Sequence, residues 1–153
     1  MRGKGSMPGI IRTSRVALDH QAADRSEAIR GAGELLVADG CVPASYVDGM
    51  LAREEIMSTF VGKGIAIPHG LEPDMATVRA AGVSVVRLQQ PVVWNDAGDQ
   101  VRIVCGIAAT AEEHLNVLSA LAEVLDDEVA LATLLKTDDP EEVVRILDPR
   151  EAA

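Results

Sequence analysis

The chain has few of the residues that support membrane insertion, disulfide bonding or base stacking. Only 2% of its 153 residues are aromatic, so the core must be aliphatic and little remains on which nucleobases could stack. Its two cysteines, Cys41 and Cys105, are too isolated to predict a disulfide framework or a zinc site. No apolar run approaches the roughly 18 to 20 residues that a membrane-spanning helix needs. These absences favour a soluble cytoplasmic protein.

Basic residues are also in deficit. The chain carries 14 Lys and Arg against 24 Asp and Glu, a formal net charge of −10. Such a surface repels nucleic-acid phosphates and anionic lipids, so neither is an expected partner. The hydrophobic share of 48% and the charged share of 25% are ordinary for a globular chain, and the length suits one domain with a full core.

The chain organisation is simple. The first residues lack the apolar stretch of a signal peptide and are compatible with a tag remnant. We assign residues 1–20 to an N-terminal extension and residues 21–150 to a single domain. His20 lies in the polar N-terminal stretch and is expected to be solvated. No internal repeat, low-complexity tract or linker divides the rest.

Hydrophobic periodicity predicts helices at both ends of the domain and strands between them. The first helix is indicated by an Asp24–Glu27 capping pair, an apolar stripe and Gly40 as a stop. The expected helices cover 24–39, 44–55, 111–125, 127–135 and 140–147. The expected strands cover 60–61, 65–67, 80–88, 91–94 (a short edge strand) and 101–109 (a central strand covered on both faces). This order indicates one α/β domain with a mixed β-sheet flanked by helices.

His69 stands out in the segment 64–70, which reads Gly-Ile-Ala-Ile-Pro-His-Gly. Pro68 ends the short apolar strand because its backbone is restricted and it has no N–H to donate, and Gly70 permits a sharp exit. The histidine is thus presented at a strand end beside residues too small to cover it. One ring nitrogen can face outward while a neighbour holds the other and sets the tautomer. A turn histidine without a role is the alternative.

His114 falls at the start of the helix expected over 111–125. Thr110 and Glu113 match a capping box, which places His114 in or just after the first turn. A helix N-terminus stabilises a nearby phosphate and disfavours a charged imidazole. His114 is therefore expected to be neutral and to act through a hydrogen bond. The alternative is a histidine that flanks the helix start for solubility.

Arg53 lies near the C-terminal end of the helix expected over 44–55. A guanidinium can hold a phosphate through two parallel hydrogen bonds, and it can equally interact with the helix dipole. Other candidates are weaker. Cys105, inside an apolar strand, is expected in the core. The segment 62–64 lacks the features of a phosphate-binding P-loop, and the Gly-x-Ser-x-Gly and His-Glu-x-x-His hydrolase motifs are absent.

Taken together, these sites resemble the mannitol/fructose-type IIA family of the phosphoenolpyruvate-dependent sugar phosphotransferase system (PTS). The resemblance runs from about Ser26 to Leu147, and its most specific part is the segment 64–70, which is similar to the family's phosphorylation site. Five other segments resemble helices, a strand and a helix start of the mannitol branch: 32–36, 46–54, 106–109, 113–115 and 125–128.

This resemblance implies a IIA domain over residues 21–150 and a role as a phosphotransferase component. His69 would accept a phosphoryl group from the general carrier HPr and pass it to a cysteine of a IIB domain during uptake of a sugar or sugar alcohol, with mannitol expected. His114 and Arg53 would support the phosphate. No metal or cofactor is required, and association with the membrane component IIC would run through IIB.

Some residues depart from the family pattern and leave other functions open. Leu71 stands where a polar residue is expected, and Lys63-Gly64 replaces the Glu-Ser typical of the mannitol branch. The segment 65–69 is equally typical of fructose-type relatives, which leaves the sugar open between mannitol and fructose. It is also typical of nitrogen-type relatives, regulatory phosphoproteins whose phosphorylation state controls a protein partner. A metal-dependent or hydrolytic enzyme using His69 and His114 is a third reading, but no third ligand or nucleophile has suitable spacing. The mannitol-like helices and the segment 125–128 favour transport.

Overall fold

A five-stranded mixed sheet forms the centre of the computed structural model, which describes residues 10–148. The strand order is β1-β4-β5-β3-β2. β4 and β5 run antiparallel, whereas β1 pairs with β4 and β3 pairs with β5 in parallel. The strands are β1 (Val16–His20), β2 (Phe60–Gly62), β3 (Ile65–Ala66), β4 (Gly82–Val93) and β5 (Gln100–Ala108). The expected α/β fold with a mixed sheet is confirmed.

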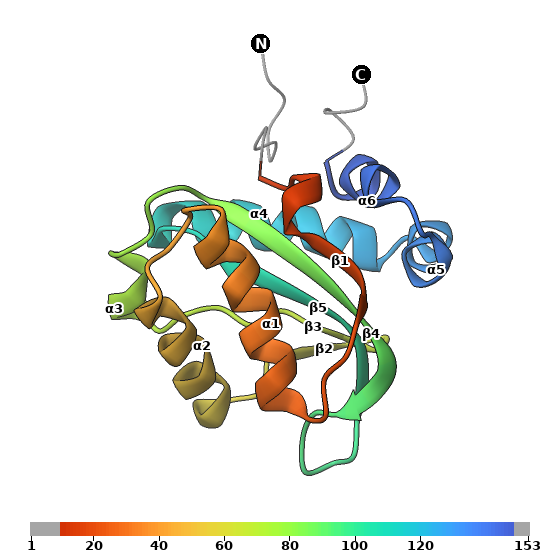
Figure 1. Ribbon diagram of the computed structural model, residues 1–153, viewed down its shortest axis with the longest axis horizontal. Helices are drawn as coiled ribbons and strands as arrows, with labels where there is room; N and C mark the ends of the chain where they lie inside the picture. Colours follow the sequence, from red (N-terminus) through yellow and green to blue (C-terminus); the bar gives the residue numbers. More distant parts are fainter. Residues whose placement is uncertain (1–9, 149–153) are drawn as a thin grey trace.

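Helices cover both faces of this sheet (Figure 1). α1 and α2 lie on one face, and α4, α5 and α6 pack on the other. The helices are α1 (Arg25–Ala38), α2 (Ser45–Ile56), α3 (Glu72–Met75), α4 (Ala111–Leu125), α5 (Glu128–Lys136) and α6 (Pro140–Leu147), and a 3-10 turn, η1 (Thr13–Arg15), precedes β1. The five helices expected from the sequence are present with ends that differ by at most one residue, whereas the short α3 was not predicted.

Side-chain caps explain where several of these helices begin. The Asp24 carboxylate accepts the Glu27 N–H at 2.9 Å at the start of α1. Thr110 and Glu113 form the expected capping box before α4. Asp127 accepts two backbone N–H groups at the start of α5. Local polar groups thus fix the starts of α1, α4 and α5, which is why these starts could be predicted from the sequence.

The sheet separates two apolar cores because side chains alternate along its strands. In β5, Val104 and Ala108 belong to the core under α1 and α2, whereas Ile103 and Ile107 belong to the core under α4, α5 and α6. Burial on both faces explains the nearly continuous apolar run that predicted a central strand, and that prediction is confirmed.

Two parts of the sheet differ from expectation. Residues 91–93 continue β4 beyond a register shift and pair with β5, so the separate edge strand expected over 91–94 is wrong. Strand β1 was not predicted at all. It carries His20, whose ring packs against α1 so closely that a Cβ on Gly31 would lie 2.5 Å from Nε2. His20 is thus half-buried, so the expectation that it is solvated is met only in part.

Candidate functional site

The loop that carries His69 is bound to the central strand of the sheet. β3 pairs with β5 through Ala66 and Val104. Just beyond β3, the Ile107 N–H donates to the Pro68 carbonyl at 2.9 Å, and His69 forms an isolated parallel bridge with Ile107. The histidine therefore lies at a strand end, as predicted, with its backbone held by β5.

Tyr46 of α2 holds the residue that follows His69. Its buried hydroxyl donates to the Ile107 carbonyl at 2.8 Å and accepts the Gly70 N–H at 3.0 Å. Gly70 is required by this close approach, since a Cβ there would lie 2.8 Å from the Tyr46 ring. Burial raises the pKa of Tyr46 above its ordinary value, so the hydroxyl keeps its proton at neutral pH. Nothing in the sequence indicated that Tyr46 holds this loop.

One ring nitrogen of His69 is held and the other is free to react. Nδ1 lies 3.0 Å from the Ile67 carbonyl oxygen. A carbonyl can only accept, so Nδ1 carries the proton and Nε2 of the neutral ring keeps its lone pair. Burial lowers the pKa of His69, against an opposing effect of the Ile67 hydrogen bond. The charge of Arg53 lowers this pKa further, whereas that of Glu54 raises it. The imidazole is therefore neutral at pH 7.

His114 lies beside His69, in the first turn of α4. The two ring centroids are 4.7 Å apart and the ring planes are tilted by 60°. The pKa of His114 is lowered by burial and then by the charges of His69 and Arg53. His114 is therefore neutral as well, as expected from its place at a helix N-terminus. A neutral imidazole here can donate or accept a hydrogen bond at a group held on His69.

Arg53 occupies the last turn of α2, as predicted, and its side chain is half-exposed. One of its guanidinium nitrogens donates to the Met57 carbonyl at 2.7 Å, just past the end of the helix. Its charge lowers the pKa of both His69 and His114, which places the guanidinium within electrostatic reach of both rings. The structure thus brings the three residues singled out in the sequence into one site.

Two carboxylates beside the site were missed in the sequence. Asp74 accepts the Leu71 N–H at 2.9 Å, and Gly49 leaves room for it, since a Cβ there would lie 1.9 Å from the carboxylate. Glu54 is buried next to Arg53 and is bonded to Thr59. Nothing in the charged segment 53–55 indicated that one of its members lies in the core.

The remaining candidates offer no second site of this kind. Cys105 is buried, as expected, and burial raises its pKa to about 12, so it is not a thiolate at neutral pH. Among residues 10–148, no cluster of three or more His, Cys, Asp or Glu side chains is arranged to hold a metal ion. Within the same residues no helix has the length and apolar character needed to cross a membrane.

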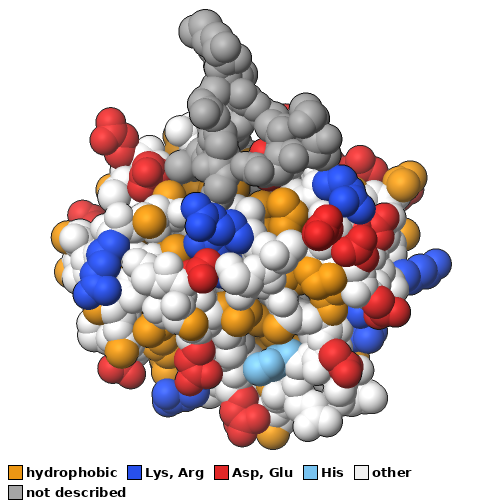
Figure 2. Space-filling model, turned by 45° about the horizontal axis from the view of Figure 1, so that its top comes forward, with side chains coloured by type: hydrophobic (Ala, Val, Ile, Leu, Met, Phe, Trp, Pro, Cys, Tyr) orange, Lys and Arg blue, Asp and Glu red, His pale blue; other side chains and the backbone are white. Residues whose placement is uncertain are grey.

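The fold and the site together define a class of protein. An α/β domain that presents a neutral, tautomer-fixed imidazole beside a second neutral imidazole and a guanidinium is suited to carry a phosphoryl group on nitrogen. The face seen in Figure 2 fits binding of proteins better than binding of nucleic acid, because its acidic and basic side chains are interspersed rather than gathered into a basic patch.

Comparison with known proteins gives the family. Residues 9–149 match the family described as "Phosphoenolpyruvate-dependent sugar phosphotransferase system, EIIA 2". The chain belongs to this family and is a PTS EIIA phosphotransferase component of the mannitol type. It is 39% identical to a mannitol-specific phosphotransferase enzyme IIA component of Halalkalibacterium halodurans, over 90% of this chain and 94% of that protein.

Longer relatives and solved structures extend this likeness. The chain is 44% identical to the mannitol-specific EIICBA component of Pasteurella multocida, matching 90% of this chain but only 22% of the longer protein. Its fold matches enzyme IIA-mannitol of Escherichia coli, solved in complex with phosphorylated enzyme IIB-mannitol, at 36% identity and a TM-score of 0.84, covering 92% of this chain and 99% of that one. It also matches nitrogen regulatory protein IIA-Ntr of Neisseria meningitidis at 30% identity and a TM-score of 0.78, covering 90% and 96%.

Proposed function

We propose that this phosphocarrier serves mannitol uptake: Nε2 of His69 accepts a phosphoryl group from HPr and passes it to a cysteine of a IIB domain. The observation that carries the proposal is the contact between His69 Nδ1 and the Ile67 carbonyl, which leaves Nε2 as the free nucleophile. The relay would operate in the cytoplasm, as the family resemblance implies, and would reach the membrane component IIC through IIB.

Each transfer exchanges one bond to phosphorus for another. The Nε2 lone pair attacks the donor's phosphorus, a new N–P bond forms, and the donor's bond breaks with its electron pair returning to the donor. In the second step a thiolate sulfur of IIB attacks the same phosphorus, and the electron pair of the Nε2–P bond returns to His69. The proton stays on Nδ1 throughout, so the leaving group is a neutral imidazole.

Arg53 and His114 are proposed to support the phosphoryl group during these steps. Arg53 supplies one positive charge toward the equatorial oxygens, and neutral His114 supplies a hydrogen bond. A single cation and a neutral donor balance the transition-state charge without binding phosphate so strongly that transfer stalls. This division of roles predicts that loss of either residue slows transfer more than it affects folding.

The surroundings of the site suit protein partners. Ile56 and Met57, at the end of α2, are 70% and 67% exposed, and Leu115, next to His114, is 71% exposed. Exposed apolar side chains around a few polar groups are typical of a protein docking surface. We therefore propose that the donor and the acceptor dock in turn over this surface.

Mannitol is proposed as the sugar because relatives that match nearly all of this chain are named mannitol-specific. The likeness to a nitrogen regulatory protein supports a second candidate, a phosphoprotein that controls a protein partner. Neighbouring genes discriminate between them: IIB and IIC genes would support transport, and a sigma-factor operon would support regulation.

The direct test is the intact-protein mass after incubation with phosphoenolpyruvate, enzyme I and HPr. We expect an acid-labile gain of one phosphoryl group, which is lost in His69→Ala. His20→Ala is the matched control, because His20 lies in β1 and should not affect labelling. Undiminished labelling of His69→Ala would place the phosphoryl group elsewhere, and no gain on the wild type with a competent HPr would reject the carrier function.

A further inference from the structure

Glu54 is a buried carboxylate that takes no direct part in the phosphoryl transfer proposed for His69. It is 3% exposed, in the last turn of α2 directly after Arg53. Its Oε2 accepts the Thr59 N–H at 2.8 Å and the Trp94 indole N–H at 3.0 Å, and its Oε1 accepts the Thr59 hydroxyl at 2.5 Å. Three donors converge on it because an unsatisfied carboxylate would be costly to bury.

A chain of hydrogen bonds runs from this carboxylate to His69. The Thr59 carbonyl accepts the Ile67 N–H at 3.0 Å. The Ile67 carbonyl in turn accepts the proton of His69 Nδ1. The N–H and the carbonyl of one residue belong to different peptide groups, so this path acts by fixing positions. Glu54 holds Thr59, Thr59 holds the backbone of Ile67, and the Ile67 carbonyl is thereby kept at Nδ1 of His69. The buried carboxylate therefore acts on the imidazole without touching it.

The charged and titratable groups facing the imidazole come from two helices. The His114 ring of α4 lies with its centroid 4.7 Å from that of His69, and the charge of Arg53 of α2 acts on both rings. The charge of Arg53 lowers the pKa of His69, whereas the charge of Glu54 raises it. Arg25 of α1 donates hydrogen bonds to the Trp94 carbonyl and to the Glu55 carboxylate, so its charge is paired there. Glu54 is thus the negative charge that offsets Arg53 at His69.

We infer that Glu54 is a positioning residue for phosphoryl transfer, which holds the proton on His69 Nδ1 through Thr59 and Ile67 and so keeps Nε2 as the atom that carries the phosphoryl group. This inference rests on the function proposed for His69. In the phosphorylated state, a proton on Nδ1 allows the ring to leave as neutral imidazole when the Nε2–P bond breaks. Without that proton the leaving group is an imidazolate, which is far poorer. Glu54 therefore favours onward transfer.

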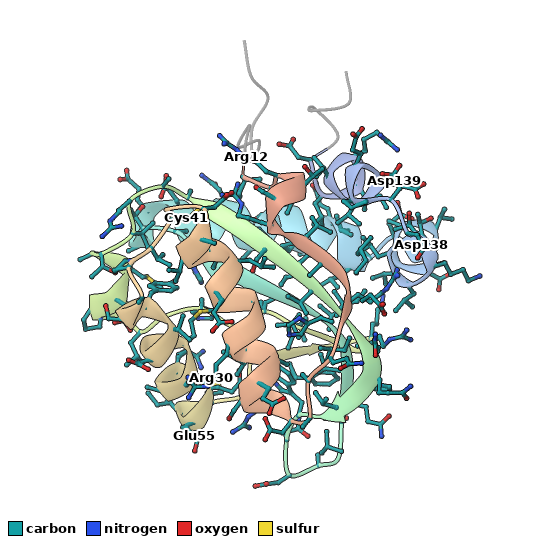
Figure 3. All side chains as sticks on the ribbon, viewed as in Figure 1. Arg12, Arg30, Cys41, Glu55, Asp138 and Asp139 are labelled. Carbon is teal, nitrogen blue, oxygen red and sulfur yellow. The ribbon has the colours of Figure 1, made fainter. Side chains whose placement is uncertain are left out.

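Glu54→Gln tests this role, because the amide has nearly the same shape but no charge and one acceptor oxygen instead of two. Glu55→Gln is the matched control. It removes the same charge one residue further on, from a side chain that is 72% exposed and paired with Arg25. Figure 3 shows Glu55 at the end of α2, pointing away from the sheet. Glu54→Asp keeps the charge but shortens the reach to Thr59.

The first readout is the nitrogen-15 NMR spectrum of the His69 ring in unphosphorylated protein, followed through a pH titration. We expect a lower His69 pKa and a smaller Nδ1–H population in Glu54→Gln, an intermediate shift in Glu54→Asp and no change in Glu55→Gln. Onward transfer to IIB should slow by about tenfold in Glu54→Gln, as is typical when an outer partner that orients a functional imidazole is removed. A purely structural role would lower the unfolding temperature without moving the His69 titration.

An unchanged His69 titration and tautomer in folded Glu54→Gln would overturn the inference. If Glu54→Gln does not fold, the His69 titration of Glu54→Asp is compared with that of Glu55→Gln, and an unchanged titration in Glu54→Asp overturns the inference. The NMR readout needs neither HPr nor IIB. It can therefore reject a role for Glu54 while mass labelling of the wild type still supports His69 as the carrier, and absent labelling would reject the carrier function whatever the titration shows.

Discussion

Replacing Tyr46 by phenylalanine tests how the fold positions His69. The change removes one hydroxyl that joins α2, β5 and the residue after His69, and it leaves the aromatic ring in place. The Gly70 N–H and the Ile107 carbonyl each lose a partner in a buried setting. Because a buried polar group without its partner costs about 1–3 kcal/mol, we expect the free energy of unfolding to fall by about that amount. For a chain of this length each kcal/mol corresponds to about 2–4 °C in Tm.

Urea unfolding gives the stability change, and the rate of mass labelling gives the functional one. Loosening Gly70 should also displace His69, and a displacement of about 1 Å can slow a positioned reaction by about 100-fold. Thr77→Val is the control, since it removes an exposed hydroxyl that donates to the Asp74 carbonyl, and such surface changes stay within about 0.5 kcal/mol. A Tyr46→Phe variant as stable and as quickly labelled as the control would refute the reasoning.

The other predictions concern the same site. His114→Ala should still be labelled but should pass the phosphoryl group on poorly, and unaffected onward transfer would return His114 to a solubilising role. The pKa values of His69 and His114 are both lowered from 6.5, so the two rings bind protons in the unfolded chain at a higher pH than in the folded one. The free energy of unfolding should therefore fall as pH drops below about 6.5. Urea unfolding at several pH values measures this slope, and a variant lacking both rings should lose it. The pKa of Tyr46 is raised above 10.0 in the folded protein, so its contribution to stability should be lost as pH rises above 10 and through the folded-state pKa. The prediction is contradicted if, at alkaline pH, the free energy of unfolding of the wild type falls no more steeply than that of Tyr46→Phe. Gly49→Ala should displace Asp74, because the new Cβ would lie 1.9 Å from its carboxylate; calorimetry should show a lower Tm, and an unchanged Tm would show that Asp74 moves without cost.

Local patterns in the sequence were sufficient for much of this molecule. Caps such as Asp24 and Thr110 lie next to the helices they start, so the helix positions follow from short segments. The apolar run of β5 reports burial on both faces. The Pro-His-Gly segment places His69 at a strand end, because the backbone limits of proline and glycine act on adjacent residues.

Tertiary structure decided the rest, because contacts distant in sequence leave no local pattern. Strand β1 depends on pairing with β4 far along the chain, so its five residues read as a polar extension. The apposition of His69 and His114 needs β3 and α4 to meet at one edge, and the tautomer of His69 depends on where the Ile67 carbonyl points. Tyr46 and Glu54 look like an ordinary core residue and an ordinary surface charge in the sequence. The sequence alone determined the family, the longer helices and the position of His69 at a strand end. Only the tertiary structure brought His114 beside that histidine and placed Tyr46 and Glu54 against the segments around it, because these contacts join residues distant in the chain.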